Sequence, residues 1–425
     1  MDRVILHCDA NSFYASCELV YHPELRGLPM SVAGDGDQRH GIILASTPEA
    51  KRCGIKTGMV TWEAKKLCPN LITMPAYFER YQNFSRRLRA MFREYTPNVT
   101  PYGLDEAWVD LTGRGVTIDD GTMIAQTLRQ RAKDELGLTL SAGISFTYCF
   151  SKLGSDMKKP DASTIISREN YQQLVWPLPA GDLLFVGPHT VPKLAACGIR
   201  TIGDIANAPE GLLESLFGKV GLMHVRHATG QYDKPPIPPE EMESVGHSVT
   251  APRDMESISD VRCVYTALAE AVSMRMRHSG VVGRCINIHV RDSKLNVRGC
   301  QKTIGYHTSL SREIVHVAME LFFSKQYERM LPLRSIGVSV SSLRHATDPV
   351  QLDIFGYEKR RQKEISLAGT VDELRSRFGT MMIRRGNVLA SPSFANINAF
   401  DDHTIYPGGD REKKGGSRCK NYLGH

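Results

Sequence analysis

The sequence lacks an apolar run approaching the roughly 18 residues that a membrane-spanning helix needs. Its opening residues, Met1-Asp2-Arg3, do not begin a signal peptide. The 10 cysteines are scattered, without a single Cys-x-x-Cys pair, which argues against a zinc site and indicates reduced thiols. We therefore expect a cytoplasmic protein that makes no contact with a membrane.

Charge of one sign is only in modest excess, with 53 Lys and Arg against 46 Asp and Glu, for a net charge of +7. That balance is compatible with a nucleic-acid partner. Hydrophobic residues make up 41% of the chain and charged residues 23%, as in ordinary folded proteins. At 425 residues, the chain is long enough for several domains with separate cores.

Two adjacent carboxylates, Asp105 and Glu106, interrupt a run at residues 102–111 that otherwise has the pattern of a strand. In an extended run, Asp105 would share a face with the apolar residues that follow, at a cost of several kcal/mol unless a cation meets it. Glu106 would point the other way. Both acids can therefore serve one site only at a strand end or beside a turn, which Gly103 supplies. The alternative is a solvated acidic hairpin tip.

A third carboxylate has a matching position. The apolar run at residues 4–8 ends in Asp9, and residues 10–18 follow with the pattern of a helix. Three carboxylates on neighbouring strand ends would form a site of oxygen ligands, which suits Mg²⁺. No cluster of His or Cys in the sequence competes for that role.

Residues 8–18 and 104–110 resemble the two metal-binding motifs of Y-family translesion DNA polymerases, and the resemblance continues in order to about Phe355. The Asp-x-Asn-x-Phe-Tyr form of the first motif is more similar to the polymerase V catalytic subunit than to DNA polymerase IV. The resemblance implies an α/β (α+β) fold with a right-hand plan: palm, fingers, helix-hairpin-helix thumb and β-rich little finger. It also implies template-directed DNA synthesis with lesion bypass.

The resemblance also divides the chain. It assigns residues 1–10 and 78–167 to the palm, 11–77 to the fingers and 168–231 to the thumb. Residues 183–199 resemble a helix-hairpin-helix, although a plain helical hairpin without a ligand fits them equally well. A linker with four prolines spans residues 232–244. Residues 245–345 form the little finger, and residues 346–425 form a tail.

By the same resemblance, Asp9, Asp105 and Glu106, with the backbone carbonyl of Ala10, hold two Mg²⁺ ions. One ion lowers the pKa of the primer 3′-hydroxyl, and the other neutralises charge on the leaving pyrophosphate. Tyr14 matches the steric gate against ribonucleotides; otherwise it is an ordinary core aromatic.

Contacts with the incoming nucleotide fall on Phe13, Tyr14, Ala45, Lys51 and Lys159. Lys51 could instead lie on a solvated helix face. Pro48 stands where many relatives carry a tyrosine that contacts the triphosphate, so that contact is not expected here. We interpret Lys152 and Lys158 as generic basic surface.

The little-finger region carries a basic excess in or beside its expected strands, where alternate residues line one face. A solvated charged face is the alternative. The residues concerned are Arg253, Arg275, Arg277, Arg284, Arg291, Lys294, Arg298 and Lys302.

Beyond that region, Gln351, Leu352, Asp353, Ile354 and Phe355 resemble the pentapeptide with which bacterial proteins bind the sliding clamp. The alternative is that the apolar residues fold back on the little finger. The expected partners are primer-template DNA, dNTPs, a sliding clamp and conceivably an accessory subunit. We expect a mixed-charge helix from about Glu358 and disorder from near Gly408.

Two alternative functions, from other classes of protein, stay open. One is a DNA-binding repair factor with a vestigial polymerase site, against which the presence of all three acids counts. The other is a palm-type nucleotide cyclase, which the helix-hairpin-helix and the basic last domain disfavour.

Overall fold

The computed structural model describes residues 3–34, 41–113, 115–209, 211–231, 234, 242–349, 357–389, 392–395 and 397. The described residues form two compact units: residues 3–34 and 42–234 in the first, and residues 242–397 in the second. Most of the predicted linker, the pentapeptide at 351–355 and the end of the chain from Gly408 lie outside the described residues. No described helix is both long and apolar enough to cross a membrane.

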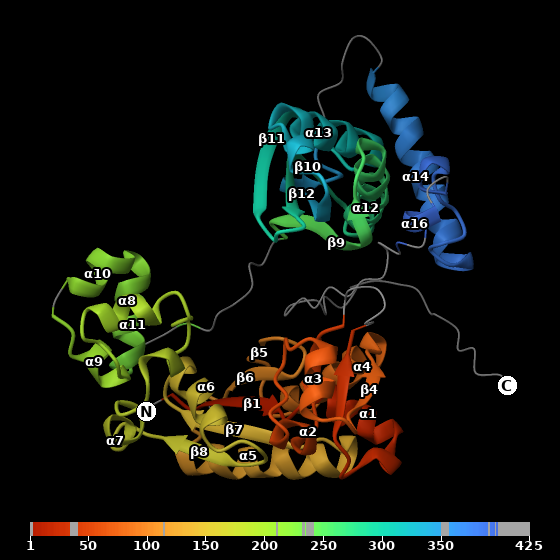
Figure 1. Ribbon diagram of the computed structural model, residues 1–425. Coiled ribbons are helices and arrows are strands. Elements are labelled where there is room, and N and C mark those ends of the chain that lie inside the picture. The colour runs from red at the N-terminus through yellow and green to blue at the C-terminus, as the bar shows by residue number, and fades with distance from the viewer. Residues whose placement is uncertain are drawn as a thin grey trace. The chain divides into compact units, whose positions relative to one another are not determined.

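The first unit is built on a five-stranded sheet in the order β5-β6-β1-β7-β8 (Figure 1). The strands are β5 (Val99–Pro101), β6 (Glu106–Asp110), β1 (Ile5–Ala10), β7 (Leu140–Ser145) and β8 (Ser163–Ile166). Every residue of β1 is buried, because both of its neighbours pair with it antiparallel and helices cover the sheet. Because β1 is the central strand, its C-terminal end, which carries Asp9, lies at the centre of the row of strand ends.

Three helices pack against this sheet. They are α4 (Phe78–Arg93), α5 (Ile118–Arg131), which continues as a π-helical turn over Ala132–Leu136, and α6 (Tyr148–Met157). Aromatic side chains recur at helical spacing along α4, and Tyr81, Phe84 and Phe92 among them are buried in the core. Helix α6 lies unusually close to β7: a Cβ on Gly143 would lie 1.9 Å from the carbonyl oxygen of Ser151. Only glycine permits that approach.

A smaller three-stranded sheet in the order β3-β2-β4 comprises β2 (Met30–Ala33), β3 (Ile43–Ser46) and β4 (Ile72–Pro75). It is accompanied by α1 (Phe13–Tyr21), the 3₁₀ turn Pro23–Leu25, α2 (Pro48–Arg52) and α3 (Thr61–Leu67). Thr47 caps α2 by accepting a hydrogen bond from the amide of Ala50, and Pro48 occupies the first turn, where its missing N–H costs nothing.

The rest of the first unit is a set of short helices. They are α7 (Tyr171–Val175), the 3₁₀ turn Ala180–Asp182, α8 (Val191–Ala196), α9 (Ile202–Ala206), α10 (Leu212–Phe217) and α11 (Lys219–Ala228). Their apolar side chains share one core with Phe146 and Phe150 of the α6 region. Residues 183–199, where the helix-hairpin-helix was predicted, contain only one helix, α8, and the 3₁₀ turn Ala180–Asp182 precedes them.

The second unit contains an antiparallel sheet in the order β11-β10-β12-β9. The strands are β9 (Ser244–Met255), β10 (Val281–Asp292), β11 (Val297–Thr308) and β12 (Leu333–His345). Helices α12 (Ile258–His278) and α13 (Ser311–Ser324) bury Ile286, Ile288, Ile336 and Val338 on one face of this sheet, and the 3₁₀ turn Tyr327–Met330 follows α13.

The opposite sheet face, which we call the open face, consists of the alternate residues of the four strands. Paired residues of antiparallel strands share a face, so the register places Arg291 there, whereas Arg298 and Lys302 point to the helical side. Lys302 accordingly forms an ion pair with Glu320 of α13. Serine, threonine, glycine and asparagine dominate the open face: Ser244, Gly246, Ser248, Thr250, Asn287, Gly299, Thr303, Ser335, Gly337, Ser339 and Ser341. The expectation of a strand face lined by basic residues was wrong, because the register sends several of them to the other side.

The second unit continues past residue 345, where the sequence placed the end of this domain. It includes α14 (Tyr357–Phe378), α15 (Gly386–Leu389) and α16 (Pro392–Ala395). Val388, Phe394 and Ile397 belong to the unit's core, and Asp372 of α14 forms a two-bond ion pair with Arg277 of α12 at 2.6 and 3.0 Å. The first part of the expected tail is thus folded.

Candidate active site

The three predicted carboxylates meet at one edge of the five-stranded sheet. Asp9 lies at the end of β1, opposite Glu106 at the start of β6. Asp105 directly precedes β6, and its carbonyl accepts a 2.9 Å hydrogen bond from the amide of Ala10. Gly103, with φ of +87°, makes the turn before it. The turn therefore brings the two adjacent acids to the same edge of the sheet as Asp9.

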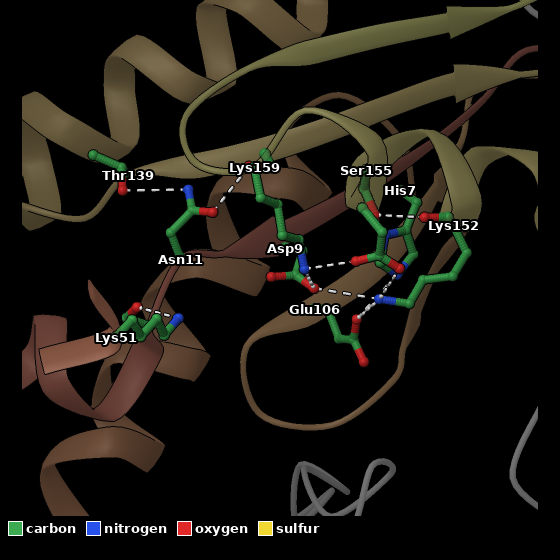
Figure 2. A network of polar contacts seen from close by, with 12 residues as sticks. His7, Asp9, Asn11, Lys51, Glu106, Thr139, Lys152, Ser155 and Lys159 are labelled. Carbon is green, nitrogen blue, oxygen red and sulfur yellow. Dashed lines mark hydrogen bonds and ion pairs between the residues drawn. The ribbon is translucent and has the colours of Figure 1, made fainter. Parts of the chain in front are cut away.

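Two lysines of the α6 region hold these carboxylates (Figure 2). Lys152 Nζ lies 2.6 Å from Glu106 Oε2 and 3.3 Å from Asp9 Oδ2. Lys159 Nζ lies 2.7 Å from Asp9 Oδ2 and 2.7 Å from Asp156 Oδ1. The interpretation of Lys152 as generic surface was wrong, because α6 packs across β1 and β7 and turns this side chain inward. Lys158, in contrast, is exposed.

Burial, repulsion between the acids and the neighbouring lysines shift the pKa values of the three carboxyl groups in different directions. Burial raises the pKa of Asp105 to about 6, and the Asp9 carboxylate adds to that shift. Burial also raises the pKa of Glu106 to about 8, although Lys152 opposes it. For Asp9, burial again acts upward, but Lys152 and Lys159 outweigh it and lower its pKa. Burial therefore opposes ionisation of Asp105 and Glu106, and a bound cation would favour their charged forms.

Beneath the carboxylates lies His7, which sequence reasoning did not select. It is fully buried, its Nδ1 lies 2.8 Å from Ser155 Oγ, and its Nε2 lies 3.4 Å from Glu106 Oε2. Because Ser155 Oγ already donates to the carbonyl of Lys152, it accepts from His7, and Nδ1 carries the proton. Burial lowers the pKa of His7 well below its usual value, so the ring is neutral. Its place two residues before Asp9 on a buried strand was the available signal.

The chain turns sharply from β1 into α1. Ser12 adopts a left-handed backbone with φ of 50°, and Phe13 and Tyr14 begin the helix. Tyr14 is half-buried and stacks on Tyr81, with 4.5 Å between ring centroids. Burial raises its pKa to about 12, with a contribution from Asp105. That contribution places the phenol near the acidic site.

Two further predicted residues come from the small sheet. Lys51 of α2 donates a 2.9 Å hydrogen bond from Nζ to Ser12 Oγ (Figure 2). Burial lowers the pKa of Lys51, and the Lys159 ammonium adds to that shift. Ala45 is half-buried on β3, opposite Val32. Apart from its hydrogen bond to Ser12, the Lys51 side chain is exposed.

The donor chemistry of the site fits a hard divalent cation, because three carboxylates with neighbouring backbone carbonyls offer oxygen alone. Among the described residues, no three His, Cys, Asp or Glu side chains are already grouped as a metal site. Ammonium groups bridge the acids instead, which shows that these oxygens gather around positive charge.

Comparison with known proteins places this geometry in a family. Residues 8–156 match the impB/mucB/samB family, and residues 242–354 match the impB/mucB/samB family C-terminal domain. The DNA polymerase IV of Acetivibrio thermocellus is 41% identical over 393 residues, covering 92% of this chain and 98% of that protein. DNA polymerase IV 1 of Bacillus subtilis is 35% identical over 391 residues, covering 91% and 93%. The chain belongs to the Y family of DNA polymerases.

The fold of this Y-family polymerase agrees with that membership. The solved structure titled "Y-family DNA polymerase chimera Dbh-Dpo4(243-245)-Dbh" matches with a TM-score of 0.73 at 20% identity, covering 80% of this chain and 98% of that chain. The predicted right-hand α/β architecture with palm, thumb and little finger is confirmed. The chain is a template-directed DNA polymerase of translesion type, which adds nucleotides from dNTPs to primer-template DNA.

The comparisons also bear on the open alternatives. They lend no support to a vestigial repair factor or to a nucleotide cyclase. These two relatives are both named DNA polymerase IV, so the likeness of the first motif to polymerase V is not matched by the similarity of the whole chain.

Proposed function

We propose that Asp9, Asp105 and Glu106, with the backbone carbonyl of Ala10, form the catalytic centre and hold two Mg²⁺ ions. The observation that carries this proposal is the meeting of three carboxylates from two paired strands, with Ala10 bonded to the backbone of Asp105. When bound, the ions would lower the pKa of the primer 3′-hydroxyl and neutralise charge on the leaving pyrophosphate.

The side chains around that centre orient the incoming nucleotide. Lys51 and Lys159 are the proposed triphosphate ligands, supported by their shared neighbourhood beside Asp9. Phe13 and Ala45 line the nucleotide, and Tyr14 acts as the steric gate where a ribose 2′-hydroxyl would project. The stacking of Tyr14 on Tyr81 supports this role, because it fixes the ring and prevents it from yielding.

The test of the centre is a pair of substitutions, Asp105→Ala and Glu106→Ala, with Asp119→Ala as the control, since Asp119 is exposed on α5. We expect the first two variants to lose primer extension with Mg²⁺ and all four dNTPs. Their affinity for primer-template should stay within about twofold, because affinity comes mainly from phosphate contacts elsewhere. Near-normal extension by Asp105→Ala would rule the centre out.

The domain boundaries given from the sequence remain part of this proposal, with palm at 1–10 and 78–167, fingers at 11–77 and thumb at 168–231. The little finger, given from the sequence as 245–345, extends to Ile397, because α15 and α16 contribute to its core. We propose that the open face of the little finger lies along the duplex backbone. Serine, threonine and asparagine side chains are common phosphate ligands, and the glycines allow a close approach. This contact positions the duplex without reading its sequence.

We also propose that residues 351–355 bind a sliding clamp, with Gln351 at the rim of the pocket and Leu352, Ile354 and Phe355 inside it. The proposal is supported by the position of the segment between β12 and α14. Replacing Gln351, Leu352 and Phe355 by Ala together should abolish stimulation by a loaded clamp and spare unassisted extension. Unchanged clamp affinity in that variant would reject the assignment.

Two further points complete the proposal. An accessory subunit remains conceivable from the polymerase V-like first motif, and adding candidate subunits to the extension assay tests it. A cytoplasmic location is supported by the nine described cysteines, all of which are free thiols.

A further inference from the structure

The Lys152 ammonium lies among three acidic side chains. Its ammonium lies 2.6 Å from Glu106 Oε2, 3.3 Å from Asp9 Oδ2 and 3.3 Å from Asp156 Oδ2. An ammonium has three N–H donors, and here each has a carboxylate oxygen within reach. Only 15% of the side chain is exposed, so water screens these contacts weakly.

The backbone beneath Lys152 is held from two sides. The carbonyl of the preceding residue, Ser151, faces Gly143 of β7 at a distance that leaves no room for a Cβ. The carbonyl of Lys152 itself accepts a 2.7 Å hydrogen bond from Ser155 Oγ, which His7 also contacts. The start of the Lys152 side chain therefore cannot move far, and any displacement of the ammonium has to come from its flexible methylene chain.

We propose that Lys152 is a resident counterion that holds Asp9 and Glu106 together in the metal-free enzyme and competes with the divalent cation for their oxygens. The inference rests on the proposed function, because it takes these acids to be metal ligands. A divalent ion binds carboxylate oxygens at about 2.0–2.2 Å. An ammonium at hydrogen-bond distance from the same Oδ2 and Oε2 atoms both blocks the approach and repels the ion. Lys152 is thus a positioning residue, and cation binding requires its release from Glu106.

The test measures Mn²⁺ binding to the full chain by electron paramagnetic resonance, without DNA or nucleotide. Wild type, Lys152→Met and Lys158→Met are compared. The last variant removes the same charge from an exposed lysine close to α6. We expect Lys152→Met to bind Mn²⁺ about tenfold more tightly or better, and Lys158→Met to stay within about twofold. Metal-free Lys152→Met should melt at a lower temperature than wild type and recover more of that loss on addition of Mn²⁺.

The outcomes separate the two proposals. If wild type and Asp9→Asn bind Mn²⁺ equally, the proposed metal site fails. If wild type binds through Asp9 but Lys152→Met binds equally or more weakly, Lys152 is only a structural clamp and this inference is overturned. Should Lys152→Met not fold, Lys152→Gln replaces it. Lys152→Arg, which keeps the charge, should bind Mn²⁺ as wild type does; tighter binding by the arginine variant would also overturn the inference.

Discussion

In the palm, acidic and basic side chains lie together where little water reaches them. Removing a carboxylate from water costs several kcal/mol, and partners at hydrogen-bond distance offset that cost. Lys152 and Lys159 supply those partners for Asp9 and Glu106, while Asp105 has a raised pKa instead. The site is therefore stable only as a group, and removing one member leaves the others uncompensated.

Sugar selection gives the first prediction about a single residue. Tyr14→Ala removes the ring that stacks on Tyr81 and opens the space proposed for the 2′-hydroxyl. We expect incorporation of rNTPs to rise by about a hundredfold or more relative to dNTPs, because a steric clash of several kcal/mol is relieved. Single-nucleotide kinetics with dCTP and rCTP measure it, and Tyr14→Phe should retain the discrimination. An unchanged ratio in the alanine variant would place the gate elsewhere.

The close contact of α6 with β7 gives a second prediction for a single residue. Gly143→Ala would place a methyl group 1.9 Å from a backbone oxygen, so the helix has to shift. We expect a loss of about 3 kcal/mol in the free energy of unfolding. Gly187→Ala is the matched control, since nothing lies within 4 Å of its added Cβ. Equal melting temperatures for the two variants would contradict the described packing.

For individual residues, the sequence predicted the three acids but not that Lys152 and His7 lie against them. Asp9, Asp105 and Glu106 stand at strand ends that local pattern reveals. Lys152 lies among several lysines near Pro160, and only the packing of α6 across the sheet distinguishes it. His7 is hidden for the same reason: its burial and tautomer depend on Ser155, which is 148 residues away.

Among the elements, α11 carries an unusual buried histidine. His224 is fully buried against Phe217, and neither ring nitrogen has a hydrogen-bond partner among the described residues. Burial lowers its pKa to about 4 from an ordinary value of 6.5. Because the unfolded chain takes up the proton first, the stability that neutral His224 contributes is complete above pH 6.5. It is lost as the pH falls toward 4.

The corresponding prediction compares His224→Phe with wild type in urea unfolding at pH 7.5 and at pH 5. Wild type should lose up to about 2 kcal/mol more than the variant over this interval. His278→Phe in the other unit is the control, with the wild-type pH dependence expected. The same pH dependence in His224→Phe would show that this ring takes up its proton equally in the folded and unfolded states.

The strands of the little finger give a prediction about DNA. Arg291 on the open face should contact a phosphate, whereas Lys302 is turned to the helical side and paired with Glu320. Arg291→Gln should reduce the slope of log affinity against log salt by about 0.9, and Lys302→Gln should leave it unchanged. Fluorescence anisotropy with labelled primer-template measures both slopes. A larger change for Lys302→Gln would mean that the register does not decide which cation meets DNA.

Helices and strands with a strong apolar periodicity can be predicted from the sequence. The helices of the little finger and the strands β10 and β12 follow from buried positions at regular spacing. Strands β9 and β11 lack such a pattern, because β11 is an edge strand with mostly exposed residues and β9 is rich in serine, threonine and glycine. Such strands are defined by pairing with neighbours rather than by their own composition.

For the whole molecule, the second unit should be the main source of DNA affinity. Removing the chain from Ser244 onward should weaken primer-template binding and flatten its salt dependence, while leaving the centre at Asp9 and Glu106 intact. Anisotropy titrations from low to moderate salt measure the slope of the truncated and full chains. Equal slopes would assign the phosphate contacts to the first unit.

The ion pairs of α14 bear on how the chain next to the proposed clamp segment is attached to the little finger. Asp372 bonds to Arg277, and Arg361 bonds to Glu313, so the chain is fastened to the little finger after residue 356 as well as before residue 350. Because α14 is part of the same folded unit as the strands before residue 350, DNA binding and clamp recruitment would both depend on the stability of that one unit.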